Sequence, residues 1–101
     1  MTARIWQGRV KASDYEAYTQ FMKDRAIPDY QSMPGFVGLQ FLRRLEGEIG
    51  HFTLITFWEN PAVIKHFAGE DYEQAKYYPE DQQYLLHFEE KVVHHEVFAS
   101  I

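Results

Sequence analysis

The sequence contains no cysteine among its 101 residues. A disulfide framework, a thiolate metal site and a cysteine nucleophile are therefore excluded. No apolar run approaches the roughly 18 residues that a membrane span requires. The first residues also lack the long apolar segment of a signal peptide. We therefore expect a soluble, cytoplasmic protein that does not interact with a membrane.

Basic residues are also scarce. The chain has 10 Lys and Arg against 15 Asp and Glu, which gives a formal net charge of −5. The basic residues are scattered, and Arg43-Arg44 is the only adjacent pair. A protein that binds nucleic acid or anionic membranes without specificity normally carries a basic stripe. We therefore expect no nucleic-acid partner.

Aromatic residues, in contrast, are abundant. They make up 17% of the chain, and hydrophobic residues of all kinds make up 46%. The length allows one domain, which we take to span residues 1–101. So many rings indicate a lined cavity or a large apolar interface, although they can also simply fill the core. The composition leaves these alternatives open.

The segment from His51 to Trp58 predicts a strand that is apolar on both faces. Because side chains alternate along a strand, Phe52, Leu54 and Trp58 point one way, and Ile55 and Phe57 point the other way. The chain has few helices, enough to cover one face of a sheet. A second copy of the chain is the simplest cover for the other face, so we expect a homodimer.

The first half of the chain predicts a strand followed by a helix. The strand covers residues 3–10. Ser13 and Glu16 then fit a capping box, in which the Ser hydroxyl and the Glu carboxylate satisfy free N–H groups at the start of a helix. The helix continues to about Ile27, and Pro28 ends or restarts it.

The middle of the chain predicts a hairpin and a second helix. Strands at 36–45 and 49–58 are joined by a short polar turn. Asn60 is suited to cap the next helix, with Pro61 at its first position, and Gly69 breaks that helix.

The last third predicts less regular structure. Asp71 can cap a short helix that reaches Tyr77, and a turn at Tyr78–Asp81 leads into an irregular segment through Leu86. A final strand covers residues 88–99. The order strand, helix, strand, strand, helix, strand is that of a ferredoxin-like α+β fold, a split β-α-β unit with a four-stranded antiparallel sheet.

Histidine and carboxylate pairs do not form a predicted metal or acid–base site. His94 and His95 are neighbours on a strand and so face opposite ways. No helical pair of histidines has i, i+4 spacing, so we expect no metal site. Glu80 and Asp81 resemble a helix cap with solvated carboxylates. No Ser-His-Asp arrangement or Gly-rich phosphate loop is present.

Several segments resemble the antibiotic biosynthesis monooxygenase-like family. They are Ala-Arg-Ile-Trp-Gln-Gly-Arg-Val at the start, Leu-Ile-Thr-Phe-Trp58 with Asn60-Pro61 behind it, and Phe67 to Asp81 with its Tyr77-Tyr78-Pro79-Glu80-Asp81 end. The similarity covers essentially the whole chain. It implies a dimeric α+β barrel with a pocket between the helices and the sheet of each protomer. The family includes quinone-forming monooxygenases, haem-degrading enzymes, haem-containing relatives, small isomerase-like and decarboxylase-like proteins, and many members of unknown role.

In its cofactor-independent branch the resemblance implies the oxidation of an electron-rich phenol or hydroquinone by O₂. Our leading interpretation is therefore a monooxygenase that needs no cofactor and acts on a small aromatic or quinol-like molecule. The implied catalytic residues are Tyr77 and His66. The implied substrate-binding residues are Trp6, Gln7, Phe67 and Tyr72.

Two other functions remain open at this stage. In the haem-degrading branch a Trp, a His that ligates iron and an amide side chain line the site. By position, Phe67 and Tyr77 would replace the Trp and the His, and Gln7 would supply the amide. Tyrosine can ligate ferric haem, but the haem pattern is broken at its iron ligand. The last alternative is a non-enzymatic dimer that binds a small ligand in the same pocket.

Overall fold

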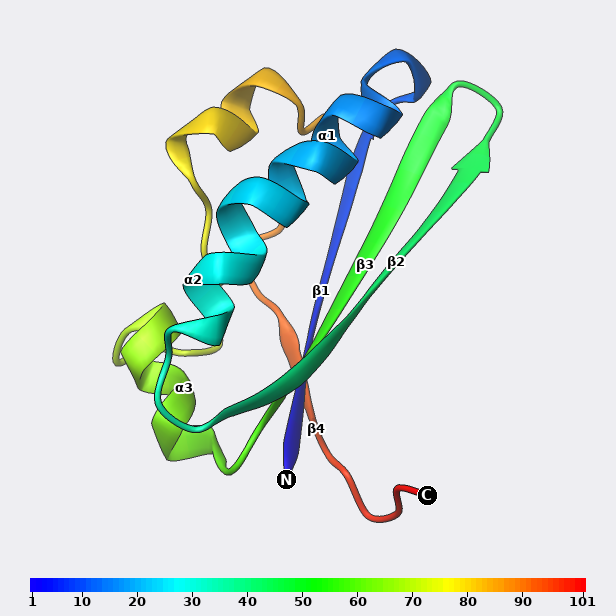
Figure 1. Ribbon diagram of the computed structural model, residues 1–101. Coiled ribbons are helices and arrows are strands. Elements are labelled where there is room, and N and C mark those ends of the chain that lie inside the picture. The colour runs from blue at the N-terminus through cyan, green and yellow to red at the C-terminus, as the bar shows by residue number, and fades with distance from the viewer.

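The computed structural model describes all 101 residues. The chain forms one four-stranded antiparallel sheet with helices on one of its faces (Figure 1). The strands lie in the order β2-β3-β1-β4. Their bounds are Thr2–Lys11 for β1, Phe36–Glu46 for β2, Ile49–Trp58 for β3 and Val93–Glu96 for β4. This is the ferredoxin-like α+β arrangement that the order of elements predicts, and the prediction is confirmed.

The long helix that crosses the sheet consists of three successive parts. They are α1 at Tyr15–Phe21, a π-helical turn at Met22–Ala26, and α2 at Ile27–Gln31. Pro28 lies in the first turn of α2. Proline has no N–H group, and its ring crowds the preceding helical turn. The wider π-helical turn directly before α2 gives that ring room. Pro28 therefore restarts the helix and does not end it.

The second helix, α3, begins as the sequence predicts and covers Pro61–Ala68. The side chain of Asn60 accepts a hydrogen bond from the backbone N–H of Val63 at 3.1 Å, and Pro61 occupies the first helical position. Gly69 ends the helix with φ at 89°, a left-handed conformation that glycine adopts without strain. No helix in the structure is long and apolar enough to cross a membrane.

Three local predictions are wrong. The capping box at Ser13 does not form, because Ser13 lies inside a short 3₁₀ turn, Ala12–Asp14, and α1 begins without a side-chain cap. No helix follows Asp71. The backbone of residues 73–75 instead pairs with residues 90–92, through Ala75 N–H to Glu90 O and Val92 N–H to Glu73 O, both at 2.9 Å. The predicted strand 88–99 is too long, because β4 covers only Val93–Glu96.

The register of the strands separates two faces of the sheet. Trp58, Leu54 and Phe52 of β3 are buried under the helices, as the alternation predicts. Ile55 and Phe57 point to the opposite face, which no element of the chain covers. The C-terminal residues after β4 extend away from the body (Figure 1), and Phe98 is 94% exposed. The uncovered face is the one that the sequence assigns to a partner.

Candidate functional site

A small aromatic pocket lies between the long helix and the sheet, closed by the segment that follows α3. Its wall from the sheet includes Arg4, Trp6 and Leu54, and Phe67 of α3 completes it. Nine of the twelve lining residues are hydrophobic, and the free volume is about 20 Å³. We call this the inner pocket. Its volume admits about one water molecule, since a water needs roughly 10–15 Å³.

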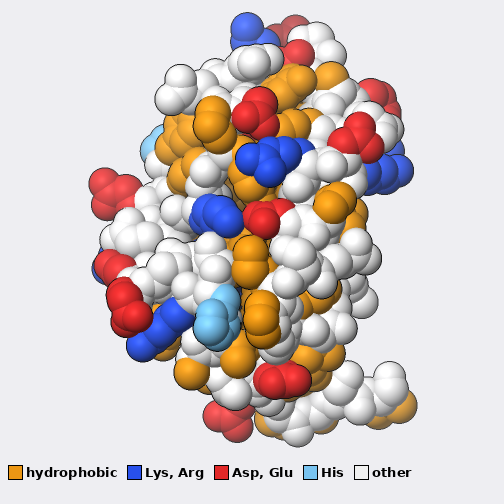
Figure 2. Space-filling view, turned by 60° about the vertical axis from the view of Figure 1, so that its left-hand side comes forward, with side chains coloured by type: hydrophobic (Ala, Val, Ile, Leu, Met, Phe, Trp, Pro, Cys, Tyr) orange, Lys and Arg blue, Asp and Glu red, His pale blue; other side chains and the backbone are white.

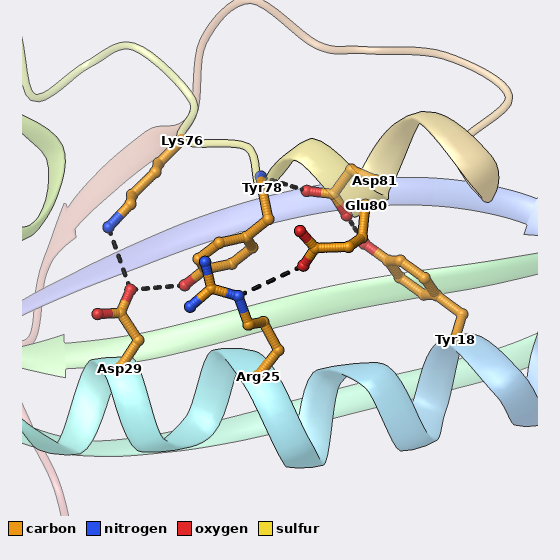
Figure 3. Close-up of polar contacts among 7 residues, drawn as sticks. All are labelled: Tyr18, Arg25, Asp29, Lys76, Tyr78, Glu80 and Asp81. Carbon is orange, nitrogen blue, oxygen red and sulfur yellow. Dashed lines mark hydrogen bonds and ion pairs between the residues drawn. The ribbon is translucent and has the colours of Figure 1, made fainter.

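A buried carboxylate lines the inner pocket. Asp81 is only 2% exposed, and it belongs to a short 3₁₀ helix, η3, at Pro79–Gln83. Its Oδ1 accepts a hydrogen bond from the hydroxyl of Tyr18 at 3.0 Å, and its Oδ2 accepts one from the backbone N–H of Tyr78 at 2.7 Å (Figure 3). Burial raises the pKa of Asp81 above its ordinary value. A titratable group of this kind in a pocket is a candidate for proton transfer.

The prediction of a solvated carboxylate pair is therefore wrong for Asp81, although its capping role is confirmed. The tyrosine that binds it comes from α1, far away in the sequence, so local pattern could not reveal the burial. Glu80 behaves as predicted. It lies outside the pocket and pairs with Arg25 at 3.4 Å, with both side chains well exposed (Figure 3).

A second carboxylate fastens the same segment to α2. Oδ2 of Asp29 accepts hydrogen bonds from the hydroxyl of Tyr78 at 2.7 Å and from Nζ of Lys76 at 3.1 Å (Figure 3). Desolvation raises the pKa of Asp29, but the hydrogen bonds from Tyr78 and Lys76 outweigh it and hold the pKa below its ordinary value. Lys76 also lies over the ring of Phe67, 4.1 Å from its centroid. A cation is thereby fixed beside an aromatic wall of the inner pocket.

Arg4 contributes a second cation that sequence reasoning missed. It is 3% exposed and makes no ion pair; its guanidinium donates instead to the carbonyl oxygens of Tyr72 and Gln74. Its Nη1 also lies 3.1 Å from Nε2 of His94. Desolvation and the neighbouring Arg4 lower the pKa of His94, which favours a neutral imidazole that accepts this bond. The sequence could have indicated this burial, because residues two apart on a strand share a face and Arg4 therefore lies on the same face as Trp6.

The structure brings together three of the predicted site residues. Trp6 and Phe67 line the inner pocket. The ring of Tyr77 stands edge-on to Trp6 with centroids 6.1 Å apart, and its hydroxyl donates to the carbonyl of Glu89 at 2.7 Å. Burial raises the pKa of Tyr77. Tyr77 therefore packs against Trp6 but does not itself line the inner pocket.

The other three predicted residues lie elsewhere. Tyr72 packs against His94, with ring centroids 5.0 Å apart, beside Arg4. His66 is exposed on α3. Gln7 lies on the sheet face opposite to Trp6, because neighbouring residues of a strand alternate.

A larger pocket adjoins the inner one and shares Met22 and Leu54 with it. This outer pocket has a volume of about 200 Å³ and lies between the long helix and strands β2 and β3. Six of its nine lining residues are hydrophobic, and Arg43, Lys23 and Thr19 supply its polar groups. In the view of Figure 2, hydrophobic side chains gather in a band along the middle of the surface, crossed by acidic and basic side chains. Met22 is a flexible side chain between the two pockets.

These residues do not fit a haem in the observed arrangement. The inner pocket has about 20 Å³ of free space, far below the size of a porphyrin. Tyr77, the residue at the position of the iron ligand, has its hydroxyl bound to Glu89. No group of three His, Asp or Glu side chains is arranged to hold a metal ion.

Comparison with known proteins shows the fold. No family model and no curated protein matches the chain. Among solved structures it is similar to the haem-degrader MhuD from Mycobacterium tuberculosis with two haems bound in its active site, with 21% identity, a TM-score of 0.67, and coverage of 100% of this chain and 99% of MhuD. It is also similar to a candidate antibiotic biosynthesis monooxygenase from Bacillus cereus, with 16% identity, a TM-score of 0.58, and coverage of 99% and 93%. A protein of unknown function from Nitrosomonas europaea matches at 13% identity and a TM-score of 0.69, over 99% and 91% of the two chains. At these identities the similarity establishes the fold alone, and it agrees with the α+β protomer fold that the resemblance implies.

Proposed function

We propose that this chain is a homodimeric, cofactor-independent monooxygenase that oxidises a small phenol or quinol-like aromatic molecule. The observation that carries the proposal is the buried carboxylate of Asp81, hydrogen-bonded by Tyr18 inside an aromatic-lined pocket. The shared fold with a candidate antibiotic biosynthesis monooxygenase supports the same class of reaction. The volume of the outer pocket restricts the substrate. It is below the roughly 300–1,000 Å³ of most ligand sites, so we propose a compound with one ring.

The ring of the substrate occupies the outer pocket, and its hydroxyl group enters the inner pocket when the side chain of Met22 moves aside. Trp6 and Phe67 line the inner pocket around that hydroxyl group. Asp81 accepts the phenolic proton as the general base, and its raised pKa brings it closer to the pKa that such a base needs near neutral pH. Lys76 and Arg4, the two cations that line the inner pocket, stabilise the resulting phenolate.

The reaction needs no reductant, because the phenolate supplies the electrons to O₂. One oxygen atom forms a C–O bond at a ring carbon and becomes the second carbonyl of a quinone. The other oxygen atom leaves as water with the two hydrogens that the phenol loses, one from its hydroxyl and one from the ring carbon. The chain's residues bind the ring, take its first proton and exclude bulk water.

The proposed dimer forms through the uncovered face of the sheet. Ile5, Ile55 and Val93 are direct cross-strand neighbours on this face, and Phe57 lies beside them. Val93, on the edge strand β4, is 56% exposed, so part of this apolar group faces solvent in the single chain. Packing two such faces together would bury on the order of 800 Å² per partner, the size of a standard interface.

Oxygen uptake with a panel of phenols and hydroquinones tests the activity, with quinone absorbance as the second readout. The Asp81→Asn variant should lose about 100-fold or more in kcat, the usual contribution of a general base. Glu80→Gln is the matched control, because Glu80 is the adjacent carboxylate and lies outside the pocket. Equal losses in the two variants would contradict the role of Asp81.

The same preparation distinguishes the other two functions. A panel compound that raises the unfolding temperature without any oxygen uptake would favour a ligand-binding dimer. A Soret band after addition of haem, lost in Tyr77→Phe, would favour a haem protein and would require the segment between Gly69 and Phe88 to move. A reshaped wall at Phe67 should abolish turnover only if the pocket is catalytic.

A further inference from the structure

The uncovered face of the sheet is sorted by register into an apolar end and a basic end. Val93, Ile5 and Ile55 lie side by side on β4, β1 and β3 at the apolar end. At the other end, Arg9 of β1 lies opposite His51 of β3, and Arg44 of β2 lies opposite the same histidine. Two guanidinium groups therefore flank an imidazole in one row across three strands.

This row is unusual for the chain. The whole sequence has 10 Lys and Arg and a net charge of −5. Arg9 and Arg44 are the charged members of the row, and His51 adds a positive charge only when it is protonated. Arg9 forms no ion pair at all, and Arg44 pairs only with Glu46, at 3.0 Å. Glu46 is therefore the only carboxylate paired with a row that carries two guanidinium groups.

The row borders a hollow of about 400 Å³, within the roughly 300–1,000 Å³ range of small-molecule sites. Only one of its nine lining residues is hydrophobic. Gln7, Thr53 and His87 add hydrogen-bonding groups to the two arginines and His51. Nε2 of His51 is buried and has no hydrogen-bond partner, although Oε1 of Glu46 lies 3.5 Å away. The hollow thus combines several hydrogen-bond donors with Nε2 of His51, which has no partner.

Two carboxylates, those of Glu89 and Glu46, lie near the hollow and would repel an anion. Glu89 lines the hollow, and its Oε1 lies 3.7 Å from Nε2 of His87. When His87 is protonated, its positive charge offsets the negative charge of Glu89. Glu46 holds Arg44, but both side chains are more than 60% exposed. An exposed ion pair contributes little to stability. An incoming anion can therefore take the place of Glu46 at Arg44.

We propose that this hollow binds a small molecule through a phosphate group, with Arg9, Arg44 and His51 as the anion's partners. Guanidinium groups suit phosphate because they donate paired, charge-assisted hydrogen bonds. The hollow is larger than a phosphate alone requires, which leaves room for the organic part of the ligand against Gln7 and Thr53. The site is on the opposite side of the sheet from the aromatic pocket, so it is independent of the oxidation proposed above. In this proposal the homodimer interface covers the apolar end of the face, and the basic end stays open to the ligand.

Isothermal titration of the full chain with inorganic pyrophosphate tests this site. Arg9→Gln and Arg44→Gln should each weaken binding by roughly tenfold or more, the effect of losing a hydrogen bond to a charged group. Glu46→Gln should tighten binding severalfold, because it frees Arg44. Arg43→Gln is the matched control. Arg43 is the neighbour of Arg44 but points to the helix side, where it bonds Glu16 and Thr19.

Absence of binding by the unmodified chain, or an equal loss in Arg43→Gln, would overturn the proposal. Weaker binding in Glu46→Gln would do the same, since it would show that the anion does not compete for Arg44. Thermal unfolding of each variant checks that the fold is kept. Oxygen uptake should be unchanged in Arg9→Gln, so that failure of this site and failure of the proposed monooxygenase activity remain separate results.

Discussion

The hydroxyl of Tyr18 lies 3.0 Å from Oδ1 of Asp81, although 63 residues separate them in the sequence. Both side chains are at most 2% exposed. The bond joins α1 to the segment that closes the inner pocket, and it does so away from bulk water. The position of the candidate base therefore depends on a residue of the first helix.

Tyr18→Phe should destabilise the fold by about 1–3 kcal/mol, because it leaves a buried carboxylate with one donor fewer. Equilibrium urea unfolding measures this loss. Tyr15→Phe is the matched control on the same helix, since it removes a hydroxyl that makes no hydrogen bond in the structure. If Tyr18→Phe were as stable as the unmodified chain, the bond would contribute nothing in solution.

The pH dependence of stability should change in Asp81→Asn. Burial raises the pKa of Asp81 above its ordinary value of 3.8, so the folded state binds this proton more tightly than the unfolded state. The contribution of Asp81 to the free energy of unfolding therefore falls as the pH rises from 3.8 through the folded pKa. Asp81→Asn should lack this fall, which urea titrations at a series of pH values would show. Parallel curves for both proteins would contradict the raised pKa.

Asp29 should respond to pH in the opposite sense. Its pKa is lowered, with the hydrogen bonds from Tyr78 and Lys76 outweighing desolvation. The stabilisation it supplies is fully present above its ordinary pKa and is lost as the pH falls through the folded pKa. At neutral pH, Asp29→Asn should cost roughly 1–2 kcal/mol. Asp24→Asn is the control, because Asp24 is exposed and bonds only Gln20; an equal cost there would exclude a specific role for Asp29.

Gly8 should not tolerate a side chain. A Cβ atom at this position would lie 2.2 Å from Cη2 of Trp6, because the indole ring lies across the glycine. Gly8→Ala should therefore displace a wall of the inner pocket and cost about 1–3 kcal/mol, as overpacking usually does. Gly38→Ala is the matched control in β2, where nothing lies within 4 Å. Urea unfolding followed by tryptophan fluorescence reports both effects, and equal stability of the two variants would contradict the contact.

Sequence pattern was sufficient for the elements whose determinants are local. The cap of α3 depends on Asn60 and its near neighbour Val63, and the two faces of β3 follow from simple alternation. The pattern failed where distant residues decide the structure. Residues 73–75 read as a helix after Asp71, but pairing with residues 90–92 takes their backbone groups. No window of sequence around Asp71 contains that partner.

The sequence predicted only part of the candidate site, because some of its residues also depend on partners that are distant in the sequence. Trp6 and Phe67 were named because the resemblance implied a pocket between the helices and the sheet, and both line the inner pocket. Asp81 was taken as solvated, since its burial depends on Tyr18 of α1. Arg4 was missed although the alternation of β1 places it on the face of Trp6, because a buried cation without a carboxylate partner is uncommon.

The uncovered face of the sheet provides the most direct test of the proposed homodimer. Val93 is 56% exposed on that face, and Leu45 is 55% exposed on the helix side of the same sheet. Val93→Lys should dissociate the dimer at low micromolar concentration, because it places a charge within the apolar group that the partner would cover. Leu45→Lys adds the same charge at the same exposure and should remain dimeric. Sedimentation analysis distinguishes the two, and a well-folded monomer of the unmodified chain at that concentration would contradict the interface altogether. Neither side chain is buried in the protomer, so we expect both variants to stay folded. Circular dichroism of each variant checks that a change in assembly is not caused by unfolding.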